Sequence, residues 1–333
     1  MLKLSSGIII FLLSINLWAQ KSPSVKDLEK SGSQSLTRGD VDSAIADFTK
    51  VIELTSRLET KSRAIRNEFA ESSTAVEDAI ARDAITVVDP RTAAAYVNRG
   101  RAYFVKGEIG KALDDFDQAI LISPYMSDSY FYRGTTFFHQ KKYDSALADF
   151  ERAIRISPSR FEAYVARGLV RLDRGDTVAA FEDFNFAVKA GPKSAVAFYY
   201  RGEAHRRAGD LKRALADFER SMKLDAQFGF PFQGRGYINL ENGAVDAAIK
   251  DFTTAVLLNP RLAEAYANRG VAYYVSGKQA EAQADFDRAC ALDPTMRADI
   301  DESLRIIQQK SRISKIESCD RYEGDRKDFR SPT

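Results

Sequence analysis

The amino-acid sequence predicts an all-α protein built as a solenoid of helical hairpins, and three observations support this. The dipeptides Arg-Gly and Asp-Phe each occupy six equally spaced positions between 99 and 286, at an interval that is seen, for example, from Arg99 to Arg133. Proline recurs in the same phase at six places. A fixed period of about 20 to 50 residues is typical of repeat architectures, in which each unit packs against its neighbours.

The N-terminal segment 1–19 differs from the rest of the chain. Lys3 precedes an apolar run from Gly7 to Leu17, and Ala19 stands ahead of the polar Gln20. This pattern is typical of a secretory signal peptide, which we expect to be cleaved after Ala19. The run is shorter than the roughly 20 apolar residues that span a bilayer, which favours cleavage over an uncleaved membrane anchor. We therefore expect a secreted or periplasmic protein with no membrane span after signal cleavage.

Each period predicts two helices joined by a turn, as the unit 93–126 illustrates. The first helix has a stripe at the spacing i, i+4, i+7, formed by Tyr96, Gly100 and Tyr103. The stripe of the second helix consists of Ala112, Phe116, Ala119 and Ile120. Gly107 suits the turn because glycine adopts a positive φ at little cost. Pro124 ends the second helix because proline has no amide donor to continue it.

Six consecutive units carry this pattern: 93–126, 127–160, 161–194, 195–228, 229–262 and 263–296. Ala44 and Phe48 indicate a further unit over 25–58 in the same phase. These residues resemble the tetratricopeptide repeat, in which an aromatic residue, Leu-Gly, Tyr, Ala, Phe and Pro recur with a period of about 34 residues. The departures are local, since Arg replaces the leucine before glycine in all six units and Ala226 replaces a proline. The predicted fold class is therefore an all-α, right-handed α-solenoid of helix-turn-helix repeats.

Three segments flank or interrupt these units. The segment 59–92 keeps the phase but has Arg66 in the glycine place and Arg82 in the phenylalanine place, so it is either a degenerate repeat or a helical insertion. Residues 297–316 place Ile300, Leu304, Ile307 and Ile313 among charged residues, as an amphipathic helix does, and we expect them to cap the last hairpin. Residues 317–333 are predicted to be a polar tail.

Arginine and aspartate recur at one fixed separation in every clear unit, with one of them on each helix of the hairpin. The six predicted pairs are Arg99 with Asp115, Arg133 with Asp149, Arg167 with Asp183, Arg201 with Asp217, Arg235 with Asp251, and Arg269 with Asp285. A feature that all units share is better explained by the scaffold than by specific recognition. We therefore interpret these pairs as a structural ladder of ion pairs.

The residues that differ between units are the candidates for partner binding. In the family that the repeats resemble, the first helices line a concave groove that grips extended peptides or partner helices. The side of the first helix opposite its stripe carries the places of residues 94, 98, 101 and 105. On this face the predicted contact residues are Tyr132, Tyr200, Phe230, Tyr237, His139, Asp173 and Arg207. The alternative is that the aromatic rings only pack against neighbouring hairpins.

Members of that family that clamp acidic chaperone C-termini use Lys, Arg and Asn on successive first helices. Here Glu29, Asp128, Glu162 and Glu264 lie on the corresponding face, so we expect no such clamp.

The sequence contains no recognisable catalytic or metal-binding pattern. Its two histidines, His139 and His205, lie far apart, and the chain has no Ser-His-Asp arrangement or glycine-rich phosphate loop. Cys290 and Cys319 follow no zinc spacing, although an oxidising compartment would permit a disulfide between them. The 49 basic and 47 acidic residues nearly cancel, which argues against nucleic-acid binding. We expect no enzymatic activity and no cofactor.

The sequence therefore predicts a non-catalytic scaffold or adaptor of the bacterial envelope, which binds a peptide or helix of a partner protein in its concave groove. The alternative is a non-catalytic subunit that recognises a small molecule or glycan within an envelope complex. The resemblance does not identify the partner, because this fold serves unrelated functions.

Overall fold

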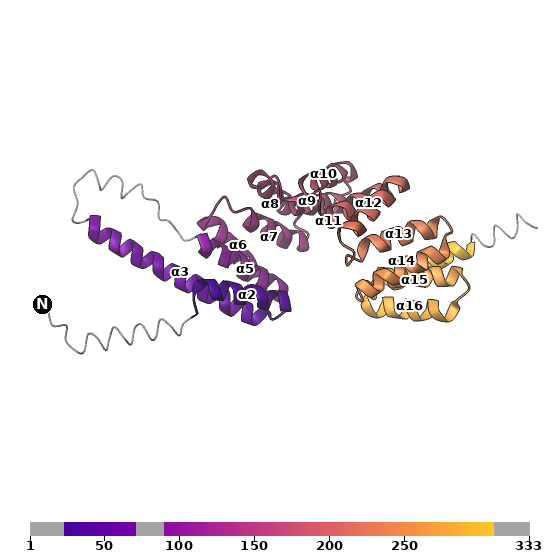
Figure 1. Cartoon of the computed structure of the whole chain (residues 1–333), viewed down its shortest axis with the longest axis horizontal. Coiled ribbons are helices and arrows are strands. Elements are labelled where there is room, and N and C mark those ends of the chain that lie inside the picture. The colour runs from indigo at the N-terminus through magenta and orange to yellow at the C-terminus, as the bar shows by residue number, and fades with distance from the viewer. Residues whose placement is uncertain (1–22, 71–89, 310–333) are drawn as a thin grey trace, which may run out of the picture. The chain divides into compact units, whose positions relative to one another are not determined.

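The computed structural model describes the backbone of residues 23–70 and 90–309, and the side chains of residues 23–57 and 90–309 (Figure 1). The predicted signal peptide over 1–19 and the predicted tail over 317–333 lie outside the described residues, as does Cys319. The described chain is helical, with no strand in it. The prediction of an all-α fold is therefore confirmed.

The described helices form seven consecutive hairpins. The first and second helices of each are α2 (Val25–Arg38) and α3 (Val41–Ala70), α5 (Pro90–Lys106) and α6 (Ile109–Ile122), α7 (Ser127–His139) and α8 (Tyr143–Ile156), α9 (Phe161–Asp173) and α10 (Thr177–Ala190), α11 (Ala195–Arg207) and α12 (Leu211–Leu224), α13 (Phe230–Glu241) and α14 (Val245–Leu258), and α15 (Ala263–Val275) and α16 (Gln279–Leu292). A last helix follows from residue 296 to the end of the described residues at 309.

In the hairpins other than that of α9 and α10, a buried phenylalanine of the second helix packs against a glycine of the first helix. In the hairpin of α5 and α6, Phe116 is buried, and a Cβ atom built on Gly100 would lie 2.7 Å from its Cε1 atom. Only glycine therefore allows the ring to lie flat on the first helix. Gly107 has a φ of +83° in the turn, as its place in the repeat predicts. At the equivalent place of the next hairpin Lys141 adopts a φ of 58°, which is unfavourable for a residue with a side chain.

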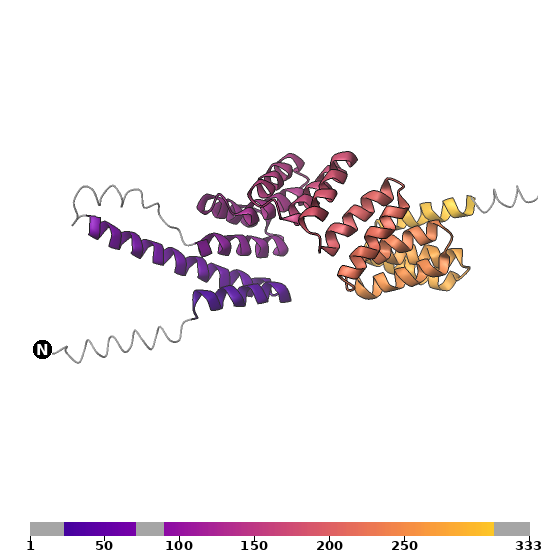
Figure 2. The ribbon, with the colours of Figure 1, turned by 45° about the horizontal axis from the view of Figure 1, so that its top comes forward.

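The chain divides into two compact units, residues 1–180 and 181–333, with the division inside α10. In the first unit, the α2–α3 hairpin packs directly on α5 (Figure 2). Arg99 on α5 donates a hydrogen bond to Thr49 on α3 at 3.1 Å, and Lys106 forms an ion pair with Asp42 at 2.8 Å.

The packing of α3 on α5 bears on the segment 59–92, which the sequence predicts to be either a degenerate repeat or a helical insertion. The helix α3 continues without a break past residue 58 to Ala70, and it packs against α5. No repeat unit therefore separates these two hairpins in the stack. Residues 71–89 lie outside the described part, so a degenerate repeat and a helical insertion both stay open for the segment 59–92.

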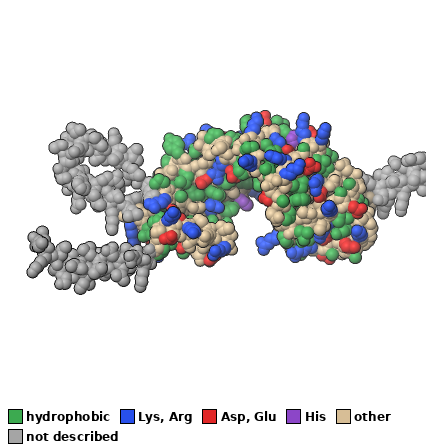
Figure 3. Space-filling view, viewed as in Figure 1, with side chains coloured by type: hydrophobic (Ala, Val, Ile, Leu, Met, Phe, Trp, Pro, Cys, Tyr) green, Lys and Arg blue, Asp and Glu red, His purple; other side chains and the backbone are tan. Residues whose placement is uncertain are grey.

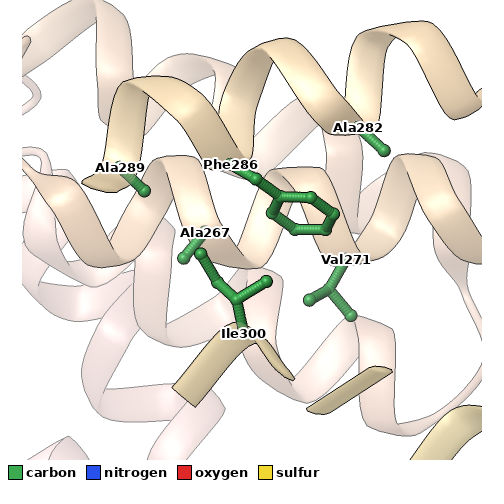
Figure 4. Packing of buried hydrophobic residues seen from close by; sticks show 6 residues of the cluster. All are labelled: Ala267, Val271, Ala282, Phe286, Ala289 and Ile300. Carbon is green, nitrogen blue, oxygen red and sulfur yellow. The ribbon is translucent and has the colours of Figure 1, made fainter. Parts of the chain in front are cut away.

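In the second unit, the helix over 296–309 covers the last hairpin. Ile300 is buried and packs with Val271 of α15 and Phe286 of α16 (Figure 4). Cys290 lies half-buried at the edge of the same cluster. Its predicted disulfide partner is not among the described residues, so the pairing remains a prediction.

Candidate partner-binding face

Within each unit the first helices of successive hairpins lie on the inner side of the stack. In the first unit α5 contacts α7 and α7 contacts α9, whereas the second helices α6 and α8 do not contact each other. In the second unit α11 contacts α13 and α13 contacts α15. Since the first helices approach one another more closely than the second helices, they form the concave side of each unit. This is the side on which the sequence places the partner-binding residues.

The first unit has a pocket of about 230 Å³ on this side, between α5 and α7. It is lined by Arg101, Phe104, Val105, Phe116, Tyr132, Thr135 and Thr136. The hydroxyls of Thr135 and Thr136 donate to carbonyl oxygens one turn earlier on α7, so they present their methyl groups as part of the wall. The interior of the pocket is therefore mainly apolar.

The rim of the pocket combines a cation with an exposed aliphatic side chain. The guanidinium of Arg101 lies over the ring of Tyr132, 4.6 Å from its centroid, and Nη1 of Arg101 donates to Oδ1 of Asn98 at 3.0 Å. Val105 is 62% exposed. An aliphatic side chain left this open beside an apolar pocket is typical of a surface that another molecule covers.

Tyr132 and Tyr200 each use one ring face within the scaffold. Tyr132 stacks on the buried Phe116 with centroids 6.3 Å apart, and Tyr200 stacks in the same way on Phe184 at 5.9 Å. Burial raises the pKa of the Tyr200 hydroxyl. Both rings are half-buried. Packing against the neighbouring hairpin thus accounts for one face of each ring, and only the remaining surface is open to a partner.

Phe230 and Tyr237 lie in the second unit in different surroundings. Phe230 belongs to a compact aromatic cluster with Tyr199 and Phe228, with centroids 5.3 to 5.6 Å apart. Burial strongly raises the pKa of the Tyr199 hydroxyl, and the nearby carboxylate of Glu203 raises it further. These rings contact one another, so the cluster has the character of a packed core.

Tyr237 is covered by a cation from the preceding hairpin. Arg206 lies over its ring, 4.4 Å from the centroid, and also forms an ion pair with Glu203 at 3.0 Å. This pairing of Arg206 with Tyr237 in the second unit has the same form as that of Arg101 with Tyr132 in the first. Each unit therefore carries an arginine stacked on a tyrosine across two first helices.

The remaining predicted contact residues lie at the ends of first helices. His139 is exposed, and its ring meets Phe104 edge-on at 4.9 Å, which places it beside the pocket of the first unit. Asp173 ends α9 and Arg207 ends α11, and both are exposed. His139 is thus brought to the same site as Tyr132, while Tyr200, Phe230, Tyr237 and Arg207 belong to the second unit.

Sequence reasoning did not single out Arg101, Phe104 and Val105, although Arg101 and Val105 lie in the rows that it identified. The variation of these positions between units marked them as candidates for partner binding, but it does not show which side chains line a pocket. Arg206 lies outside those rows, so no pattern in the sequence pointed to it.

The repeated arginines and aspartates meet within their hairpins. In the pairs that begin at Arg99, Arg133, Arg201, Arg235 and Arg269, Nε and Nη2 donate to the two carboxylate oxygens at 2.7 to 2.9 Å. The aspartates are buried. The hydrogen bonds to Asp149 raise the pKa of Arg133. Arg167 lies in the first unit and Asp183 in the second.

Side chains of both charges lie on the described surface. Lys, Arg, Asp and Glu side chains interleave over the face seen in Figure 3, in keeping with the nearly balanced totals of the sequence. Within the described residues, no group of three or more His, Cys, Asp or Glu side chains could hold a metal ion. In the same part of the chain, none of the helices combines the length and the apolar character that crossing a membrane requires.

Family models of the tetratricopeptide repeat match residues 64–128, 127–160, 165–227 and 263–296, more than half of the chain. The chain belongs to the tetratricopeptide repeat family. The predicted resemblance is thereby confirmed. One match includes residues 64–92, of which 71–89 lie outside the described residues. Comparison with curated proteins finds no match.

Solved structures of tetratricopeptide repeat proteins share the fold at low sequence identity. A tetratricopeptide repeat protein of Parabacteroides merdae is 17% identical, with a TM-score of 0.56 over 84% of this chain and 97% of that one. The Cut9–Hcn1 hetero-tetramer of the APC/C contains a chain that is 16% identical, with a TM-score of 0.57 over 79% and 52%. PilF of Pseudomonas aeruginosa is 15% identical, with a TM-score of 0.53 over 61% and 92%.

Tetratricopeptide repeats form a scaffold for interactions between proteins, and the fold is in general non-catalytic.

Proposed function

We propose that this tetratricopeptide repeat protein is a non-catalytic adaptor of the bacterial envelope, and that it holds a segment of a partner protein on the concave side of α5 and α7. The observation that carries the proposal is the apolar pocket whose rim is formed by Arg101, Tyr132 and the open side chain of Val105. The predicted signal peptide supports the location.

The size and chemistry of the pocket favour a peptide over a small molecule. Its volume of about 230 Å³ is below the roughly 300 to 1,000 Å³ of typical small-molecule sites. It accommodates one apolar side chain of a longer segment, which would continue along the groove past His139. Arg101 is already stacked on Tyr132, so it can donate to a backbone carbonyl or carboxylate of that segment without first losing rotamer freedom.

The test is site-specific photo-cross-linking in living cells. Benzoylphenylalanine placed at Val105 should capture a discrete partner, whereas the same group at Leu121 should capture none. Leu121 is the matched control because it is 75% exposed on the second helix α6 of the same hairpin. Val105→Asp should abolish capture from a cross-linker placed at Thr135. Equal capture from Val105 and Leu121 would refute binding of the partner on the concave side of α5 and α7.

The location is tested separately. Osmotic-shock fractionation and N-terminal sequencing should yield a periplasmic or secreted chain that begins at Gln20. A full-length chain in the membrane fraction would instead support the uncleaved anchor.

A further inference from the structure

The second unit contains a cavity of about 430 Å³ between α10, α11 and α12. It is lined by Phe181, Asn185, Arg201, His205, Arg213, Ala216 and Asp217. Arg201 and His205 are spaced i, i+4 and so share one side of α11. Tyr200 and Glu203 of the concave side lie on other sides of the same helix. The cavity is thus separate from the groove of the proposed function.

One donor in this cavity has no acceptor among the described residues. Arg201 uses Nε and Nη2 on Asp217, and its Nη1 makes no hydrogen bond there. In the equivalent arginines, Nη1 donates to the second helix of the preceding hairpin in the stack: Arg99 to Thr49 at 3.1 Å, Arg133 to Asp117 at 2.6 Å, and Arg269 to Thr253 at 3.3 Å. The repeat therefore has a regular place for an oxygen acceptor, and Asn185 occupies that place in front of Arg201.

Asn185 does not accept a hydrogen bond from Nη1 of Arg201, since the described hydrogen bonds of Arg201 all go to Asp217. In the following hairpin the place is held by Glu219. There the pKa of Arg235 is raised first by its hydrogen bonds to Asp251, and the charge of Glu219 adds to this. Among the five described pairs, Arg201 is thus the one that faces neither a hydroxyl nor a carboxylate at this place.

His205 supplies a second unpartnered polar group. The residue is only 8% exposed, it lines the cavity, and its ring forms no hydrogen bond within the described residues. Phe181 meets the imidazole edge-on at 4.9 Å and holds its orientation. At the equivalent place Asn239 donates to Asp251 at 2.9 Å. A buried polar ring without a partner is costly unless a ligand or water completes it.

We propose that this cavity binds the carboxylate of an acidic side chain, aspartate or glutamate, on a partner protein. Asp117 shows within the same chain how such a carboxylate binds, because it accepts a hydrogen bond from Nη1 of Arg133 in the first unit. In the second unit the partner's carboxylate takes that place on Arg201, with the amide of Asn185 and the ring of His205 as further donors. The remaining volume, bounded by Phe181 and Ala216, receives the methylene groups of the side chain.

The charges around the cavity permit this assignment. Asp217 is negative, but both of its oxygens accept from Arg201. Arg213 faces the cavity, and its ion pair with Asp210 at 3.1 Å is largely exposed, so solvent weakens it. The Arg201 side chain is 24% exposed and lines the cavity.

The experiment titrates the whole chain with N-acetylglutamate N-methylamide and follows the Arg201 Nε–H and His205 ring signals by NMR. The neutral glutamine analogue should bind at least 10-fold more weakly, because charge-assisted hydrogen bonds are about twice as strong as neutral ones. Two variants copy residues that the chain itself uses at the same place. Asn185→Asp supplies an internal carboxylate, as Asp117 does, and His205→Phe removes the ring nitrogens and introduces the residue type that Phe137 is at the equivalent place.

Both variants should weaken binding of the glutamate probe at least 10-fold. Thr253→Asp is the matched control, since it adds the same charge at the equivalent place of another hairpin, and it should leave the affinity unchanged. Equal binding of the glutamine analogue, or undiminished binding to Asn185→Asp, would overturn the proposal. Succinate binding 10-fold more tightly than the glutamate probe would also overturn it, because the site would then belong to a free small acid. Loss of cross-linking at Val105 would not affect this outcome.

Discussion

The ion pairs between the two helices of a hairpin should differ in how much stability is lost when their aspartate is neutralised, and this difference can be measured. Asp217→Asn removes one negative charge and keeps the side-chain shape. Arg201 then loses two charge-assisted hydrogen bonds, of 2.8 and 2.7 Å, and has no other acidic partner among the described residues. In contrast, Asp149→Asn leaves Arg133 bonded to Asp117 at 2.6 Å through Nη1.

The expected loss of stability in each variant follows from the burial of the ion pair. Removing one partner of a buried ion pair costs about 3–5 kcal/mol, because the other charge remains without compensation. The Arg201 side chain is 24% exposed, so water recovers part of this loss. We expect Asp217→Asn to lower the local stability by about 2–3 kcal/mol, given the range for hydrogen bonds to charged groups. We expect Asp149→Asn to cost about 1 kcal/mol, because Arg133 keeps an exposed acidic neighbour.

Hydrogen exchange measured peptide by peptide is the suitable assay. Solenoids unfold in segments, so a single melting temperature would average the effect over the array. Asp217→Asn should accelerate exchange in α11 and α12, and Asp149→Asn should do so less strongly in α7 and α8. Asp114→Asn, an exposed change of the same charge on α6, is the control and should have no effect. Equal losses of exchange protection in Asp217→Asn and Asp149→Asn would show that Asp117 does not compensate the charge of Arg133.

Three further predictions concern turns, close packing and pH. Lys141→Gly should raise the stability of its hairpin by about 0.5–1 kcal/mol, measured by hydrogen exchange, because Lys141 has a φ of 58°; Lys142→Gly, at a residue with a φ of −84°, should give no gain. Gly100→Ala should destabilise by about 1–3 kcal/mol, because its Cβ atom would lie 2.7 Å from Phe116, whereas Gly110→Ala on the same hairpin, with open space around it, should be neutral or stabilising in thermal melts. Burial lowers the pKa of His205 below its usual 6.5, and the charges of Asp217 and Asp210 only partly oppose this. The unfolded chain therefore binds a proton more readily, so protonation of His205 lowers the stability as the pH falls below about 6.5, and this proton-linked loss is absent above that pH. The wild-type chain should lose more stability than His205→Asn between pH 7.5 and pH 5 in denaturant titrations, and parallel curves would contradict this.

The hairpin itself could be predicted from the sequence because its determinants are local and repeated. Gly100, Phe116 and Gly107 have their roles within a single repeat unit, and the same roles recur in the following units. The constant spacing of Arg99 and Asp115 placed them on facing helices, where they form two hydrogen bonds. Helical periodicity also located the face that carries Tyr132 and Val105.

The candidate sites depend on contacts that the period does not encode. The period left residues 59–92 as either a degenerate repeat or an insertion, and it did not show that α3 packs on α5, because stacking depends on complementary surfaces rather than on distance along the chain. Likewise, Tyr132 and Phe230 carry the same aromatic chemistry in the sequence. Only their neighbours make one the wall of an open pocket and the other part of a packed cluster.

The sequence by itself determined the repeat, the pairing of helices within each hairpin and the concave face, since each follows from residues that lie within one period of one another. The tertiary structure decided which side chains close the pocket beside Arg101 and which donor of Arg201 is left without an acceptor. Both depend on the positions of side chains from three helices. Small differences between otherwise equivalent hairpins, such as Asn185 in the place of Asp117, determine whether Nη1 of the repeated arginine has an acceptor within the described chain.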